Sequence, residues 1–231
     1  MMEWEWERAD QSLQRAIALD PAYTWARDMY AILLAQQGRL DEAIEQLQRA
    51  RRLDPVTAPL GVTDLGFLYS LKGDLESAAE AWQASLELAP DDFRVHRLLG
   101  NHFCRRGDFE EAFREFERAM SVVHDRERLL SDLGYCHALA GNREEAEEYL
   151  EQIEASAEQM YVDPVHPALV HLGLGDSDRS LELLQRAYDL HGSLLTEVPT
   201  DPRYAPLHSD PRYQEIVRGI GLGSLLPPPK G

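Results

Sequence analysis

The fold of this chain is decided by residues 65–82, which read LGFLYSLKGDLESAAEAW. Gly73 interrupts this stretch, and glycine readily takes the left-handed backbone conformation that ends a helix. Asp74 follows at a place where a carboxylate favours the positive start of the next helix. Small residues at Gly66 and Ala78 let two helix axes approach each other closely. The stretch therefore predicts a hairpin of two helices.

The same pattern returns along the chain every 34 or 35 residues. Glycines in phase with Gly73 stand at Gly38, Gly107, Gly141 and Gly175. A small residue precedes each glycine by seven positions, a second small residue follows it by five, and a large residue comes four positions later. Because one hairpin cannot bury both of its faces, this period predicts a stacked array of hairpins rather than one irregular core.

A helix-turn-helix unit of this length resembles the tetratricopeptide repeat. The resemblance rests on Leu65-Gly66, Ala78, Trp82 and Pro90 in one unit and on Leu99-Gly100, Ala112 and Phe116 in the next. It implies an all-α fold, a right-handed α-solenoid of antiparallel helix-turn-helix repeats with a C-terminal capping helix. The repeats are expected at 24–57, 59–92, 93–126 and 127–160, with a divergent one at 161–190. Within 127–160, His137 stands where an aromatic residue is usual.

Residues 1–21 read as the second helix of one more repeat, because Ala9, Leu13 and Ala16 stand 34 residues before equivalent positions of the next unit. Its partner helix is not in the sequence. Two interpretations follow: the chain is the C-terminal piece of a longer protein, or this helix caps the array by itself. We expect this end to self-associate, possible contacts being Trp4, Trp6 and Ile17.

Residues 191–231 are expected to form a cap and a loose tail. Asp201-Pro202-Arg203-Tyr204 and Asp210-Pro211-Arg212-Tyr213 both look like helix starts, with aspartate as the N-cap and proline in the first turn. The second predicts a short helix from Pro211 to about Arg218 that covers the last repeat.

This ending carries a second resemblance. Gly173 to Arg179, Ala187-Tyr188 and the doubled Asp-Pro-Arg-Tyr, together with Trp4-Glu5-Trp6, are similar to the C-terminal repeat region of bacterial multidomain signalling proteins. In that group the repeats follow a class III nucleotide cyclase, a serine/threonine kinase or a winged-helix DNA-binding domain. The resemblance implies a non-catalytic sensing or docking module of such a regulator.

Composition narrows the classes of partner. The chain has 41 acidic and 23 basic residues, and its net charge of -18 repels a phosphate backbone, which argues against direct nucleic-acid binding. No apolar run approaches the roughly 18 to 20 residues of a membrane span, and no signal segment opens the chain. We therefore expect a cytoplasmic protein that binds neither DNA nor membrane.

Motifs of catalysis and metal binding are not found in the sequence. It has no phosphate-cradling glycine loop and no Gly-x-Ser-x-Gly. Cys104 and Cys136 lack Cys-x-x-Cys spacing, and no pair of histidines has the i, i+4 spacing of helical metal ligands. We expect neither an enzyme nor a bound metal or cofactor, and we expect both thiols to be reduced and buried.

A partner is expected on the concave face that the first helix of each hairpin lines. Helical spacing and the resemblance place on this face Trp25, Asp28 and Ile32; Thr63, Phe67 and Ser70; Arg94, Arg97, Asn101 and Cys104; and Arg128, Ser131 and Tyr135. This set predicts a protein or extended peptide with an acidic residue near the arginines and an apolar side chain against Phe67 or Tyr135. Alternatively, the arginines pair with acids of the chain itself.

Two of these residues resemble a known binding motif. Arg97 and Asn101 match the basic and asparagine places of the carboxylate clamp in chaperone-binding repeat proteins, and an arginine fork beside an amide suits a carboxylate. Asp132 stands where that clamp places asparagine, and an acid there disfavours an anionic end group. Three functions stay open: a peptide or protein docking module, a regulatory segment of a signalling protein, and a self-assembly scaffold that dimerises.

Overall fold

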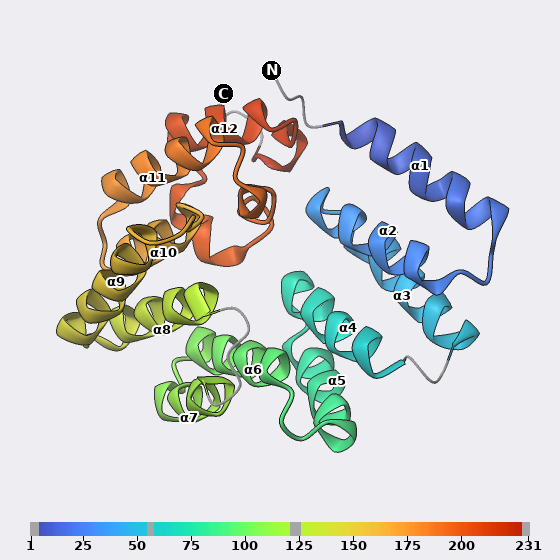
Figure 1. Ribbon diagram of the computed structural model, residues 1–231, viewed down its shortest axis with the longest axis horizontal. Coiled ribbons are helices and arrows are strands. Elements are labelled where there is room, and N and C mark those ends of the chain that lie inside the picture. The colour runs from blue at the N-terminus through green and yellow to red at the C-terminus, as the bar shows by residue number, and fades with distance from the viewer. Residues whose placement is uncertain (1–4, 55–57, 121–125, 228–231) are drawn as a thin grey trace. The chain divides into compact units, whose positions relative to one another are not determined.

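The computed structural model describes residues 5–54, 58–120 and 126–227, and helices account for all the regular secondary structure in those ranges. The chain divides into two compact units, Met1–Pro90 and Asp91–Gly231. In the first unit consecutive helices pack against one another (Figure 1): α1 (Trp6–Leu19), α2 (Thr24–Gln36), α3 (Leu40–Leu53), α4 (Ala58–Lys72) and α5 (Leu75–Leu88). The predicted all-helical array is thereby confirmed.

The second unit continues the hairpins and then departs from them. Its α-helices are α6 (Phe93–Arg106), α7 (Phe109–Met120), α8 (Arg126–Ala140), α9 (Arg143–Ala157), α10 (Val165–Gly173), α11 (Ser177–Asp189) and α12 (Pro211–Gly219). Three 3₁₀ helices follow α11 in the chain, η1 (Ser193–Thr196), η2 (Pro202–Leu207) and η3 (Gly223–Leu225). Helix α8 packs against α7, α9, α10 and α6, so the first helices of successive hairpins meet within this unit.

The repeated glycine ends the first helix of each hairpin, as predicted. Gly107 has φ 81°, and its N–H donates to the carbonyl of Cys104 while the next N–H, of Asp108, donates to that of Phe103. The other glycines of the series share the positive φ: Gly38, Gly73, Gly141 and Gly175. A side chain is strained in this conformation, which explains why glycine recurs there.

The small residues seven positions before these glycines are required by close packing. A Cβ atom at Gly100 would lie 2.5 Å from the ring of Phe116, and one at Gly66 would overlap the indole of Trp82. Both rings are buried, and the Trp82 indole N–H donates to the carbonyl of Thr63 at 3.2 Å. A large residue of the second helix therefore lies directly on the backbone of the first.

The C-terminal region carries the predicted helix starts. Asp201 accepts a hydrogen bond from the backbone N–H of Arg203 at 3.0 Å, and Asp210 accepts one from that of Arg212 at 2.8 Å. The first cap opens a 3₁₀ helix and the second opens α12, which packs against α11. Helix α12 buries Tyr213, Ile216 and Val217, so the predicted covering helix is confirmed. The described residues include no helix long and apolar enough to cross a membrane.

Candidate functional site

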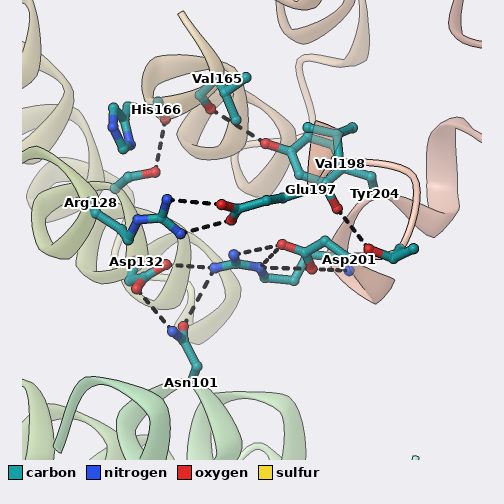
Figure 2. A network of polar contacts seen from close by, with 12 residues as sticks. Asn101, Arg128, Asp132, Val165, His166, Glu197, Val198, Asp201 and Tyr204 are labelled. Carbon is teal, nitrogen blue, oxygen red and sulfur yellow. Dashed lines mark hydrogen bonds and ion pairs between the residues drawn. The ribbon is translucent and has the colours of Figure 1, made fainter. Parts of the chain in front are cut away.

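A buried carboxylate lies at the centre of a polar network in the second unit (Figure 2). Asp132, on α8, is 1% exposed. Its Oδ2 accepts from Arg97 Nη1 at 2.7 Å and from Asn101 Nδ2 at 2.9 Å, both on α6. Its Oδ1 accepts from Arg203 Nη1 at 2.6 Å. One carboxylate thus joins two neighbouring first helices to a residue 71 positions later in the chain.

Arg203 is held by a fork of its own. Its Nε and Nη2 donate to Asp201 Oδ2 at 2.9 Å and 2.6 Å. Its guanidinium carbon lies 5.8 Å from the ring centroid of Tyr135, within the range of a cation–π contact. Because the planar guanidinium offers donors on two edges, Arg203 bonds Asp201 with one edge and Asp132 with the other.

A second ion pair fastens the same part of the chain. Arg128 of α8 donates to the two carboxylate oxygens of Glu197 at 2.9 Å and 3.3 Å. The Tyr204 hydroxyl donates to the Val165 carbonyl at 3.3 Å. We name residues 193–207 the cap segment, because they lie against the first helices α6, α8 and α10 of this unit.

The electrostatics of the site follow from this pairing. Burial alone would raise the pKa of Asp132, but the charges of Arg203 and Arg97 and the hydrogen bonds from Arg203 and Asn101 lower it below the usual range. Burial raises the pKa of Tyr135 to about 12. Two carboxylates, Asp132 and Asp201, face two guanidiniums, so the buried charges balance. The pocket between α8, α10 and the cap segment is about 30 Å³, room for little more than a water.

Four of the predicted groove residues meet in this network: Arg97, Asn101, Arg128 and Tyr135. Arg94 lies one turn before Arg97 on α6 and is partly buried. Asp132, which the sequence presented as the residue that breaks a carboxylate clamp, is instead the carboxylate that the arginine and the amide hold. The sequence left open the alternative that the arginines pair with acids of the chain itself. Arg97 and Arg128 do so.

The remaining groove residues belong to the first unit. Trp25 and Ile32 on α2 are 56% and 46% exposed, and Phe67 on α4 is 38% exposed. Burial and the charge of Asp64 raise the pKa of Asp28. No ion pair involves Asp28 within the described residues. This unit therefore presents apolar side chains and an acid on its first helices.

Three positions expected on the groove are buried instead. Thr63 Oγ1 lies 2.8 Å from Ser85 Oγ, and Ser131 Oγ donates to the His166 carbonyl at 2.9 Å. Cys104 packs in the core around Phe116, as does Cys136. Helical spacing assigned these residues to a single exposed face. That assignment was wrong, because a first helix contacts its own second helix on one side and the next hairpin on the other. Both cysteines are free thiols.

The sequence did not predict that the cap segment bonds to side chains of α8. Glu197 and Arg203 lie more than 60 residues from their partners on α8, Arg128 and Asp132. The doubled Asp-Pro-Arg-Tyr was the available signal, but it indicated helix starts and a family resemblance, and no contact with α8. The pairing of Arg203 with Asp132 needs the tertiary structure, because spacing along a helix carries no information on contacts at this separation.

The N-terminal residues proposed for self-association lie on α1. Trp6 and Ile17 are partly buried against a core that includes Tyr30 and Leu34 of α2. Trp4 lies outside the described residues. Self-association through this end stays a prediction.

Histidines and cysteines of the described ranges do not form a metal site, since no group of three His, Cys, Asp or Glu side chains there could hold an ion. His96 is buried and its Nδ1 lies 2.7 Å from Glu115. His137 stacks on Phe113, with ring centroids 4.2 Å apart. His137 therefore packs at the aromatic place of its repeat, and His96 contacts a carboxylate of α7.

Comparison with known proteins gives one family for the helices from α1 to α9. Residues 5–61, 63–92 and 91–159 each match the tetratricopeptide repeat. Human "Tetratricopeptide repeat protein 13" is 33% identical over 113 residues, covering 49% of this chain and 13% of that protein. "BBSome complex member BBS4" of Bos taurus is 26% identical over 136 residues, covering 57% of this chain and 25% of that protein.

A solved structure agrees on the fold. The type IV pilus biogenesis factor PilW superimposes with a TM-score of 0.61 over 92% of this chain and 91% of that one, at 16% identity. The chain spans a quarter or less of the two curated relatives, so their full-length activities concern much more than these repeats. Because the three family matches together cover more than half of the residues and follow the observed hairpins, the chain belongs to the tetratricopeptide repeat family.

Proposed function

We propose that this chain is a non-catalytic docking module that binds a protein or extended peptide along its first helices. Tetratricopeptide repeat proteins mediate protein–protein interactions, which supports the general role. One observation carries the choice of surface: Trp25, Ile32 and Phe67 are large apolar side chains left exposed on α2 and α4. Aromatic side chains of this kind are common anchors of protein interfaces. We name Trp25, Asp28, Ile32 and Phe67 the α2–α4 surface.

The charge of this surface suggests the chemistry of its partner. Asp28 lies three residues after Trp25, on the same side of α2, and interacts unfavourably with Asp64 of α4. A cationic side chain from a partner would stabilise the charged form of Asp28, which burial and Asp64 disfavour. We therefore expect the α2–α4 surface to take a segment that combines apolar residues with a lysine or arginine.

The acidic partner predicted for the arginines of the second unit would compete with acidic side chains of the chain itself. Arg97, Asn101 and Arg128 already contact acids of the chain itself. A partner carboxylate would have to displace Asp132 or Glu197 from them. For this reason the proposed function places the partner on the α2–α4 surface.

Peptide selection followed by substitution tests the proposal. Peptides are selected from a random library on the intact chain, and their affinities are measured for Trp25→Ala, Phe67→Ala and Asp28→Asn. We expect at least a tenfold loss for Trp25→Ala or Phe67→Ala, as for an interface anchor. Leu88→Ala is the matched control, since Leu88 is 64% exposed on the second helix α5. Peptides that respond to Leu88→Ala and not to the other variants would contradict the proposal.

We further propose that the module belongs to a larger bacterial regulator. The support is the similarity of Gly173 to Arg179 and of the doubled Asp-Pro-Arg-Tyr to the C-terminal repeats of such proteins. Sequencing the genomic region around the reading frame tests this idea. An adjoining cyclase, kinase or winged-helix domain is expected, and an adjoining domain of an unrelated class would count against it.

A further inference from the structure

The face of α6 and α8 contains a receptor for a cation rather than for an anion. Its central group is the carboxylate of Asp132, which is 1% exposed. Arg97 and Asn101 occupy Oδ2, and Oδ1 is left for a donor from outside the two helices. That donor is Arg203, delivered by the cap segment.

The surroundings select a guanidinium among cations. Arg203 bonds Asp132 through Nη1 while its Nε and Nη2 bond Asp201. The ring of Tyr135 lies 5.8 Å from its guanidinium carbon. A lysine ammonium is a single compact head on a flexible stem, so it cannot hold two carboxylates on separate edges and also present a flat face to a ring.

The chain offers an internal comparison in its second Asp-Pro-Arg-Tyr. Arg212 forms the same fork with Asp210, at 3.1 Å from Nε to Oδ1 and 2.8 Å from Nη2 to Oδ2. Its further acceptor is Asp178, at 2.7 Å, whose side chain is 81% exposed. The two copies share the local fork and differ in the acceptor, so the buried receptor belongs to α6 and α8 and not to the Asp-Pro-Arg motif.

We propose that Arg97, Asn101, Asp132 and Tyr135 form a guanidinium-binding site that Arg203 occupies in the folded chain. The site takes an arginine side chain, and an arginine-bearing partner segment enters it only by exchange with the cap segment. Asp201 leaves with the cap segment, so Asp132 and Tyr135 are the groups that such a segment meets. This inference concerns the second unit and stands independently of the α2–α4 surface.

Chemical rescue of the intact chain tests the proposal. Arg203→Ala removes a group equivalent to ethylguanidinium and leaves Asp132 without its outer donor. We expect its melting temperature to fall by about 10 °C, since breaking a buried ion pair is strongly destabilising. Ethylguanidinium at millimolar concentration is expected to raise the melting temperature of this variant in a saturable manner. Ethylammonium at the same concentration is expected to have no such effect.

Two controls make the outcome decisive. Arg212→Ala is the matched variant, and ethylguanidinium should not stabilise it or the unsubstituted chain. Adding Asp132→Asn to Arg203→Ala should abolish the rescue, because the receptor carboxylate is gone. The proposal is overturned if ethylguanidinium acts equally on Arg203→Ala and Arg212→Ala, or if rescue survives Asp132→Asn.

Hydrogen exchange covers the case in which Arg203→Ala fails to fold. In the single variant Asp132→Asn, the amides of residues 201–207 should exchange at least tenfold faster than in the unsubstituted chain. The amides of α2 and α3, in the other unit, should be unchanged. Unchanged exchange in residues 201–207 would mean that Asp132 does not hold the cap segment, and the proposal would fail.

Discussion

Single residues decide the polar character of the second unit. A buried carboxylate is tolerated only where cations and hydrogen-bond donors replace its water. Asp132 receives three donors from two parts of the chain, Arg97 and Asn101 on α6 and Arg203 in the cap segment. Of the arginines that gave the sequence a basic groove, Arg97 is neutralised by Asp132 and Arg128 by Glu197.

Asp132→Asn should destabilise the chain by about 3 to 5 kcal/mol at neutral pH, because two partly buried guanidiniums lose the buried carboxylate that they share. The pKa of Asp132 is lowered in the folded state, so its contribution is present above the unfolded pKa of about 3.9 and is lost as the pH falls further. Urea unfolding of the variant and the unsubstituted chain at pH 7, 5 and 3 measures this. A difference that is as large at pH 3 as at pH 7 would refute the assignment.

His137→Phe should reduce the sensitivity of the chain to mild acid. Burial lowers the pKa of His137, whose ring stacks on Phe113. The unfolded chain then takes up the proton first, so stability is present above the unfolded pKa of about 6.5 and declines as the pH falls through the folded pKa. Melting temperatures at pH 7.5 and 5.5 should differ less in the variant. The exposed His191→Gln is the control, and an equal effect there would contradict this interpretation.

Helices and their turns form the next scale, where each hairpin depends on one backbone conformation. The repeat glycines have positive φ, and Gly66 and Gly100 lie directly under aromatic rings. These conformational and packing requirements repeat in every hairpin, so the residues that meet them recur at regular intervals in the sequence. The first-helix faces are less regular, since Thr63 and Ser131 point into contacts with neighbouring helices.

Gly107→Ala should destabilise the second unit by about 1 kcal/mol, because alanine is strained at φ 81°. Apart from its immediate chain neighbours, nothing lies within 4 Å of an added Cβ at this position, so the effect is one of backbone conformation and not of overlap. Gly107→Asn should recover part of the loss, since asparagine tolerates this region better. Chemical denaturation of the three chains checks the order glycine, asparagine, alanine. Alanine equal to glycine would show that the turn does not constrain the helix.

At the scale of the whole chain, net charge opposes the self-association predicted for the N-terminal end. A chain with a net charge of -18 repels its copies at low ionic strength, and salt screens that repulsion. Trp6 and Ile17 also contribute to the core of their own unit. An apolar dimer contact at this end would therefore have to form beside groups that already stabilise the monomer.

Light scattering should detect a dimer whose fraction rises with protein concentration and with sodium chloride from 20 to 300 mM. The direction of the salt effect follows from screening of like charges. A mass of one chain at every concentration and salt level would rule out the predicted scaffold. Trp6→Asp is a poor probe here, because loss of core packing and loss of a dimer contact would act together.

The sequence by itself determined the family and the hairpin architecture. A 34-residue period repeats the same local requirements, a left-handed glycine and small residues beneath large ones, and local requirements can be read along a chain. It also identified Arg97, Asn101, Arg128 and Tyr135 as neighbours on first helices. Only the tertiary structure decided what these residues bind. Arg203 and Glu197 come to α8 from more than 60 residues away, and charge pairing between distant segments follows from how the helices pack and not from spacing.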